Sequence, residues 1–362
     1  MSYLSYDEIL SGVRALADAY GEHCRMLELP NPSIEGRPIL ALALGGGCDE
    51  DRPTAIYVGG VHAREWIPPD ALLYLCADLL EAGATGVGLS YGTARISADE
   101  VRQIFEGMRL IVLPCANPDG RVYSQEVDPD WRKNRGGSGD DVCVGVDINR
   151  NFDVAWDFRR TFAPGFVSAS DDPCHKYVYV GPAAASEPET RNIVWLLDQF
   201  PRAGWFIDVH GAVPAVFYNW GLDEPQSDDP AQNFLNPSFD GQRGVAGDAG
   251  YREFIEPADA AELRRLSDLM SAEIAKVRND AYDVSPSFSL YATSGASDDY
   301  AYSRHRADPA RSKVLGFTIE CGHDFQPEWS EAEEVVREVS AALARFAAEV
   351  SVQALAVQDE AV

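Results

Sequence analysis

Two histidines and a glutamate have the residue types and spacing of a catalytic metal site. His62 and Glu65 lie three residues apart in VHAREW, and His210 closes the run GWFIDVH. Two ligands within one turn and a distant third leave a fourth position open, which is typical of catalytic rather than structural zinc sites. Because an H-x-x-E spacing also arises by chance, two ordinary buried histidines are the alternative interpretation. The pattern alone leaves both open.

Further polar residues near these positions suit hydrolytic chemistry. Glu320 closes GFTIE and is either a general base or a strand-end carboxylate paired with an arginine. Asp147 is either a support for a metal-bound histidine or a turn cap. Arg132, Asn149 and Arg150 lie in a polar, glycine-rich region where solvated charge is the default. An arginine beside an asparagine nevertheless suits the binding of a carboxylate.

The elements that would position these residues alternate along the chain. Six short apolar runs predict strands at 38–44, 54–60, 108–114, 204–210, 215–220 and 313–320. Boxes of the form S-x-x-E predict helix starts at Ser5, Ser97, Ser186 and Ser330. This alternation predicts an α/β domain with a parallel or mixed sheet. His62, Glu65, His210 and Glu320 then fall at the carboxyl ends of strands, where open α/β sheets bind ligands.

We expect one domain over residues 1–350, since no repeat or linker interrupts the pattern. Residues 221–258 are rich in Pro, Asp, Asn and Gly, which predicts a surface insertion. It forms either a rim over the cleft or a passive loop. Residues 351–362 are expected to be a disordered tail.

The composition excludes some partners. The formal net charge is −28, and such a surface repels nucleic acid and anionic lipid. No apolar run is long enough to cross a bilayer, and the N-terminus lacks the pattern of a signal peptide. We therefore expect a cytoplasmic protein that binds neither nucleic acid nor membranes, while the oligomeric state is left open.

Seven ordered motifs resemble a known family. VHAREW, NPDGRVY, WRKNR, CVGVDINRNFD, FIDVH, YATSGASDDYAY and FTIE occur in the order seen in zinc carboxypeptidases of the carboxypeptidase A/B type. The resemblance runs from about Tyr3 to about residue 350. It implies a single α/β/α sandwich around a twisted mixed sheet, with one catalytic Zn²⁺.

The resemblance also implies a role for each matching residue. His62, Glu65 and His210 would bind the zinc, and Asp147 would support His62. Arg132 would stabilise the oxyanion, and Glu320 would act as the base towards the attacking water. The substrate's free C-terminal carboxylate would be held by Asn149, Arg150 and Tyr291, and Arg64 would line the subsite beyond the scissile bond. The substrate would be a peptide or small amide with a free C-terminal carboxylate.

Asp298 falls at the position of the family's pocket floor. An aspartate there resembles the carboxypeptidase B type, which prefers C-terminal Lys or Arg, because a buried carboxylate pairs well with a cation. A cap on the following helix is the alternative role.

Several features depart from the family pattern. Gly211 and Ala212 follow the third ligand in place of the usual serine and tyrosine, and Ala296 replaces a glycine. Cys143 and Cys174 correspond to a disulfide of secreted relatives, which makes export the alternative to the expected cytoplasmic location. Two other functions stay open. One is an amidohydrolase acting on a modified peptide, an acylated amino acid or a cell-wall fragment, and the other is an inactive binding module.

Overall fold

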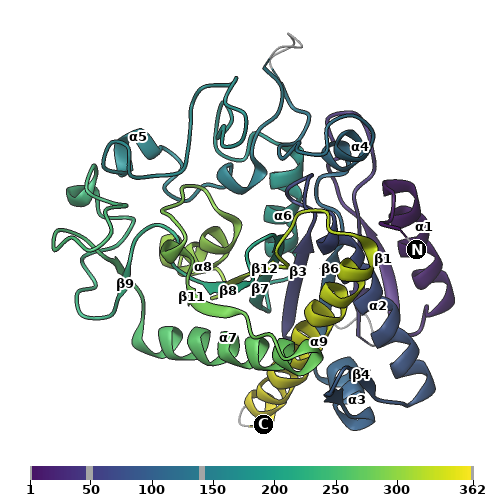
Figure 1. The fold of residues 1–362 in the computed structure, drawn as a ribbon. Coiled ribbons are helices and arrows are strands. Elements are labelled where there is room, and N and C mark those ends of the chain that lie inside the picture. The colour runs from purple at the N-terminus through teal and green to yellow at the C-terminus, as the bar shows by residue number, and fades with distance from the viewer. Residues whose placement is uncertain (1, 46–51, 138–142, 360–362) are drawn as a thin grey trace.

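The computed structural model describes residues 2–45, 52–137 and 143–359, which are arranged around an eight-stranded mixed sheet (Figure 1). The strand order is β1-β2-β6-β3-β7-β12-β8-β11, and the four central neighbours β6, β3, β7 and β12 run parallel. The strands span Cys24–Glu28 (β1), Leu40–Leu44 (β2), Thr54–Gly59 (β3), Arg109–Leu113 (β6), Ala203–Gly211 (β7), Ala215–Tyr218 (β8), Asp283–Pro286 (β11) and Leu315–Cys321 (β12). The predicted α/β fold with a mixed sheet is confirmed.

Helices cover both faces of this sheet. They span Tyr6–Ala19 (α1), Ile67–Thr85 (α2), Ala98–Gly107 (α3), Pro118–Glu126 (α4), Phe158–Thr161 (α5), Pro188–Gln199 (α6), Pro257–Arg278 (α7), Ser297–Ala307 (α8) and Trp329–Asp359 (α9). Helices α2 and α7 both pack against α9, while α8 packs against β7 and β12 (Figure 1).

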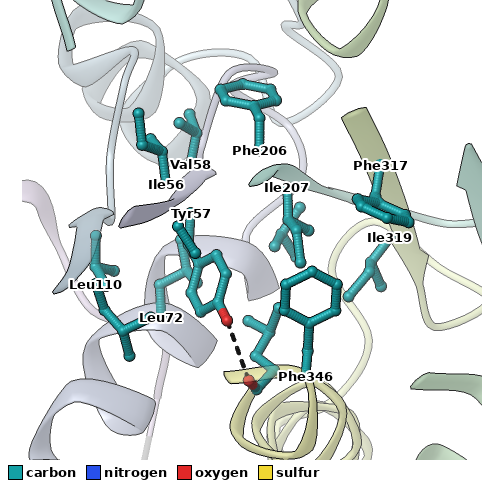
Figure 2. Packing of buried hydrophobic residues seen from close by; sticks show 14 of the residues in the cluster. Ile56, Tyr57, Val58, Leu72, Leu110, Phe206, Ile207, Phe317, Ile319 and Phe346 are labelled. Atoms are coloured by element: carbon teal, nitrogen blue, oxygen red, sulfur yellow. Dashed lines mark hydrogen bonds between the residues drawn. The ribbon is translucent and has the colours of Figure 1, made fainter. Parts of the chain in front are cut away.

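The core explains why the central strands read as unbroken apolar runs. Every residue of β3 and β6 is buried, as expected for strands covered on both faces. Figure 2 shows Tyr57 and Ile207 pointing towards Phe346 of α9, whereas Ile56 and Phe206 point the other way. Since side chains alternate along a strand, Asp208 and His210 lie on the same face as Phe206, away from α9.

Two of the four serines predicted to start helices are N-caps in the structure. Ser5 and Ser97 each cap a helix with a reciprocal bond to the glutamate three residues on. The prediction at Ser186 was wrong by one residue, because Glu187 is the cap and Pro188 occupies the first turn. Ser330 lies just inside α9, which begins at Trp329.

Two segments differ from the expectation of irregular chain. The tail was predicted to be disordered from residue 351, yet α9 continues to Asp359, because its helical pattern runs on without a Gly or Pro. The 221–258 insertion contains a small parallel pair, β9 (Pro225–Gln226) and β10 (Glu253–Phe254), and a 3₁₀ turn over Pro237–Phe239. Within the described residues, no helix is long and apolar enough to cross a membrane.

Candidate active site

Three adjacent strands bring the predicted ligands and base together. His62 follows the end of β3, His210 lies near the end of β7, and Glu320 lies near the end of β12. The parallel register places Glu320 directly beside His210. All three strands end at the same edge of the sheet, which is why residues far apart in sequence meet there.

His62, Glu65 and His210 form a compact, buried cluster. Their candidate ligand atoms lie within 4.8 Å of one another, and each residue is at most 3% exposed. Glu65 Oε1 lies 2.8 Å from His62 Nδ1, and Glu65 Oε2 lies 3.0 Å from His210 Nδ1. The Nδ1 atoms of the two histidines are 2.9 Å apart. No other cluster of three such residues that could hold a metal occurs in the described part of the chain.

The outer nitrogens of both histidines face buried aspartates. His62 Nε2 lies 3.2 Å from Asp147 Oδ1, and His210 Nε2 lies 3.0 Å from Asp208 Oδ2. Each carboxylate holds the proton of its imidazole on Nε2, so both Nδ1 lone pairs face inward. Two imidazole nitrogens and one carboxylate converging in this way fit the donor set of a catalytic zinc ion.

Asp208 is a site residue that the sequence analysis missed. It is fully buried, and its Oδ2 also accepts a 2.5 Å hydrogen bond from the Ser297 hydroxyl. A signal for it was present in FIDVH, because residues two apart on a strand share one face. An aspartate two residues before a metal-binding histidine at a strand end therefore lies on the side of the metal.

Asp147 joins the metal site to Arg132. Its Oδ2 accepts hydrogen bonds from Nε and Nη2 of Arg132, at 3.1 and 3.0 Å. Burial alone would raise the pKa of Asp147, but the positive charge of Arg132 and the hydrogen bond from His62 outweigh it and lower the pKa. Arg132 Nη1 lies 3.9 Å from Glu65 Oε1, so the guanidinium borders the metal cluster.

A cavity opens beside the metal cluster and contains most of the remaining predicted residues. Its lining includes His62, Arg132, Asn149, Arg150, Tyr291, Asp298 and Glu320. Burial, and next the negative charge of Glu65, raise the pKa of Glu320 to about 8 in the metal-free site. A carboxyl group with a raised pKa is suited to take up and release a proton near neutral pH.

Asn149 and Arg150 occupy a short 3₁₀ turn, Ile148–Arg150, that the Asp147 side chain caps. The guanidinium of Arg150 is fixed by two bonds of 2.6 Å, from Nε to the Ser168 carbonyl and from Nη1 to the Asn149 carbonyl. Tyr291 is 43% exposed, and its ring centre lies 5.8 Å from Arg150 Cζ. Cationic and amide donors beside an available tyrosine can bind a carboxylate.

Asp298 is in the first turn of α8 and is 3% exposed. Its Oδ2 accepts a 2.9 Å hydrogen bond from Ser287, and its Oδ1 accepts one from the Asp299 backbone amide. The cap of α8 is Ala296 without a side-chain bond, so the alternative capping role of Asp298 is not observed. Burial raises the pKa of Asp298, and no Lys or Arg within the described ranges forms an ion pair with it.

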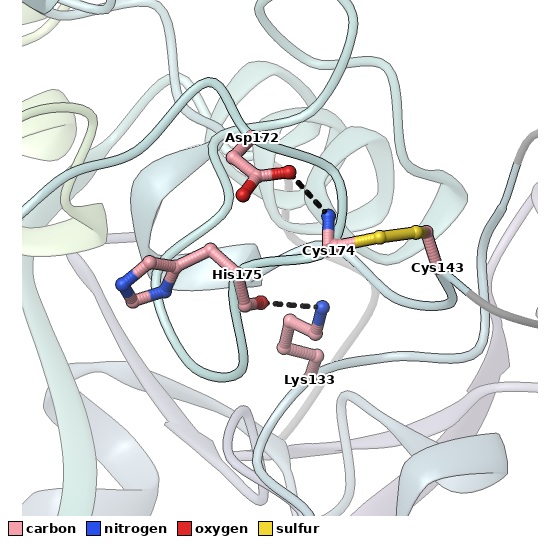
Figure 3. The surroundings of a disulfide bond; sticks show 5 residues. All are labelled: Lys133, Cys143, Asp172, Cys174 and His175. Carbon is pink, nitrogen blue, oxygen red and sulfur yellow. Dashed lines mark hydrogen bonds between the residues drawn. A yellow bond between two sulfur atoms is a disulfide. The ribbon is translucent and has the colours of Figure 1, made fainter.

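Arg64 belongs to a second cavity that adjoins the first at Arg132 and Tyr291. Its guanidinium lies over the rings of Tyr177 and Phe325 and pairs with Asp130 at 3.0 Å. Figure 3 shows the Cys143–Cys174 disulfide beside Asp172 and His175, and the pairing implied by the resemblance is present. Eight of the predicted site residues thus line one of two adjoining cavities, while Glu65, His210 and Asp147 each contact His62.

Comparison with known proteins agrees with this geometry. The model of the zinc carboxypeptidase family matches residues 9–342. Carboxypeptidase B of Astacus astacus is 33% identical over 63% of this chain and 67% of its own length. Mast cell carboxypeptidase A of Rattus norvegicus is 32% identical over 53% of this chain and 41% of its own length. A third relative, named inactive metallocarboxypeptidase ecm14 of Talaromyces marneffei, is 30% identical over 60% of this chain and 34% of its length.

Solved structures show the same fold. The bovine thrombin-activatable fibrinolysis inhibitor, solved with a tick carboxypeptidase inhibitor, aligns with a TM-score of 0.71 at 22% identity. That alignment covers 96% of this chain and 97% of the other. Carboxypeptidase A of Helicoverpa armigera aligns with a TM-score of 0.69 at 24% identity, covering 96% and 74%. The family model matches this chain over most of the chain's length. The chain therefore belongs to the zinc carboxypeptidase family and is a metallocarboxypeptidase.

Proposed function

We propose that this chain is a zinc-dependent carboxypeptidase that removes the C-terminal residue of peptides and prefers Lys or Arg in that position. The observation that carries the proposal is the convergence of four groups on one cavity. These are the metal cluster, the base Glu320, the cation Arg132 and the carboxylate-binding pair Asn149 and Arg150.

Binding of the terminal carboxylate fixes which bond is cut. Two of the donors of Arg150 are held by the Ser168 and Asn149 carbonyls, so the rest of its guanidinium has a fixed orientation at the cavity wall. A carboxylate held there by Arg150, Asn149 and Tyr291 places the last peptide bond towards the metal cluster. Fixing one end of the substrate in this way limits the enzyme to one residue per turnover.

The residues around the scissile bond have separate roles in hydrolysis. Zinc held by His62, Glu65 and His210 would supply a Lewis acid and lower the pKa of water. Arg132, oriented by Asp147, lies beside this cluster and stabilises the negative charge that develops on the carbonyl oxygen. Glu320 removes the proton of the attacking water and then delivers a proton to the leaving amine.

The preference for basic residues rests on Asp298. A buried carboxylate without an ion-pair partner in the described residues gains most from a cation that enters the cavity. The side chain of a C-terminal Lys or Arg carries such a cation, whereas Leu or Phe would leave the carboxylate unpaired.

The test compares kcat/KM on blocked dipeptides ending in Arg and in Phe, with the C-terminal amide of the Arg peptide as a control. The proposal predicts release of Arg over Phe, loss of release with a chelator, and little cleavage of the amide. Preference for Phe would reject the role of Asp298 alone. No release of either residue from zinc-loaded protein, with cleavage of an acylated amino acid or cell-wall fragment, would favour the amidohydrolase. Inactivity towards every amide would favour a binding module, as in the relative named inactive.

A further inference from the structure

We infer that the 221–258 insertion positions Arg150 and Tyr291, and that it thereby sets the affinity for the substrate's terminal carboxylate. The inference rests on the proposed function for the role of these two residues. No described residue of the insertion lines either of the two cavities, so its effect on the site must pass through the chain segments that it contacts.

The insertion has a rigid centre in Arg243, which is fully buried. Its Nη2 donates to the carbonyls of Asn233 and Asn236, at 3.2 and 3.1 Å, and its Nη1 pairs with Asp240 at 3.0 Å. The guanidinium also lies 4.8 Å from the centre of the Tyr251 ring. A planar, fully charged group with this many acceptors holds the backbone of residues 233–243 in one arrangement.

The same arginine connects the insertion to residues 161–168. Arg243 Nη1 donates to the Thr161 carbonyl at 3.3 Å, and the Arg243 carbonyl accepts from the Ala163 amide at 2.9 Å. The Gly241 amide donates to Thr161 as well, and Phe162 and Arg243 form a parallel bridge. The insertion therefore holds the start of segment 161–168, at Thr161 and Ala163, through hydrogen bonds to its backbone.

Segment 161–168 in turn holds the carboxylate-binding residues. The Ser168 carbonyl accepts the 2.6 Å bond from Arg150 Nε, and the Ser168 amide donates to the carbonyl of Ala292 at 2.9 Å. Ala292 is the residue after Tyr291. One residue of the segment thus fixes both the guanidinium of Arg150 and the backbone next to Tyr291.

Gly244 forms a second, direct connection. Its φ of +92° suits glycine, and its amide donates to Asp223 at 2.6 Å. A Cβ added to Gly244 would lie 2.7 Å from the Phe166 carbonyl oxygen and 3.3 Å from Ala292 Cβ. The insertion therefore packs against the carboxylate-binding region so closely that one methyl group would displace it.

The test substitutes Gly244→Ala, with Gly247→Ala as the matched control. Gly247 lies in the same insertion with a φ of +70°, and nothing lies within 4 Å of an added Cβ. Both substitutions place a Cβ on a positive-φ backbone, at a cost of about 1–2 kcal/mol, and only the first presses on Phe166 and Ala292. For the Arg dipeptide we expect Gly244→Ala to raise KM about tenfold or more, with kcat changed less than threefold. The Gly247→Ala variant should keep both values of the native protein.

Hydrogen exchange gives a readout that is independent of turnover. The amides of residues 161–168 should exchange faster in Gly244→Ala than in Gly247→Ala. If Gly244→Ala does not fold, Arg243→Lys takes its place with the same two measurements. Equal KM values and equal exchange in the two variants would overturn the inference. If the native protein releases no residue, the proposed function fails, and the exchange data alone decide whether the insertion positions this segment.

Discussion

The substitution Asp298→Asn tests whether a buried carboxylate sets the specificity. Asparagine keeps the size of the side chain and an oxygen that can accept the Ser287 bond, but it removes the charge. Asp298 is 3% exposed, so a Lys or Arg side chain paired with it is out of water. Removing one partner of a buried ion pair costs about 3–5 kcal/mol. A loss of 3 kcal/mol corresponds to a fall of roughly 150-fold in kcat/KM for the Arg substrate.

The assay measures kcat/KM for dipeptides ending in Arg and in Leu, on the native protein and on two variants. Asp299→Asn is the matched control, because Asp299 is equally buried but bonds to Asn219 and the Gly221 amide and does not line the cavity. We expect Asp298→Asn to lose at least a hundredfold on Arg while Leu is unchanged or improved, and Asp299→Asn to keep the ratio of Arg to Leu. A ratio unchanged by Asp298→Asn, or shifted equally by both variants, would refute the reasoning.

Three further substitutions probe other parts of the account. Glu320→Gln should lower kcat by about a thousandfold or more while the protein still binds one zinc, because Glu320 acts on protons and is not a ligand; loss of the metal would contradict that role. Asp208→Asn should weaken zinc binding by roughly 10–100-fold in a chelator competition, because it removes the carboxylate that orients His210, and unaltered affinity would remove Asp208 from the site. Burial raises the pKa of Glu189 to about 7. Between about pH 4.5 and 7, the folded state therefore keeps a proton that the unfolded state has lost, and the free energy of unfolding falls as the pH rises through this range. Glu189→Gln should therefore raise Tm at pH 8 and leave it almost unchanged at pH 4.5; an equal change at both pH values would mean that Glu189 does not titrate in this range.

The central fold and the metal cluster were predictable because both follow from apolar runs. Buried parallel strands such as β3 and β7 read as continuous apolar segments, and ligands at their carboxyl ends must meet at one edge. His62, His210 and Glu320 could be found on this basis. The edge strands β1 and β11 could not, because most of their residues are partly exposed and DVSP contains a proline.

The rest of the site depends on contacts that no local pattern records. Asp208 was hidden inside a strand, and only the alternation of side chains shows that it shares a face with His210. The relation between Arg243 and Arg150 runs through the backbone of residues 161–168, which carries no sequence motif. Irregular segments of this kind are defined by tertiary hydrogen bonds rather than by propensity, so their roles become visible only in the structure.

The most direct test of the account is a zinc titration of metal-free protein, followed by release of Arg from the blocked dipeptide. If His62, Glu65 and His210 hold the catalytic ion, activity should rise in proportion to added zinc and reach its limit at one equivalent. The variant His210→Ala should bind zinc far more weakly and stay inactive at that equivalent. Full activity without zinc, or an unchanged zinc stoichiometry and affinity in His210→Ala, would contradict the assignment of this cluster as the catalytic metal site.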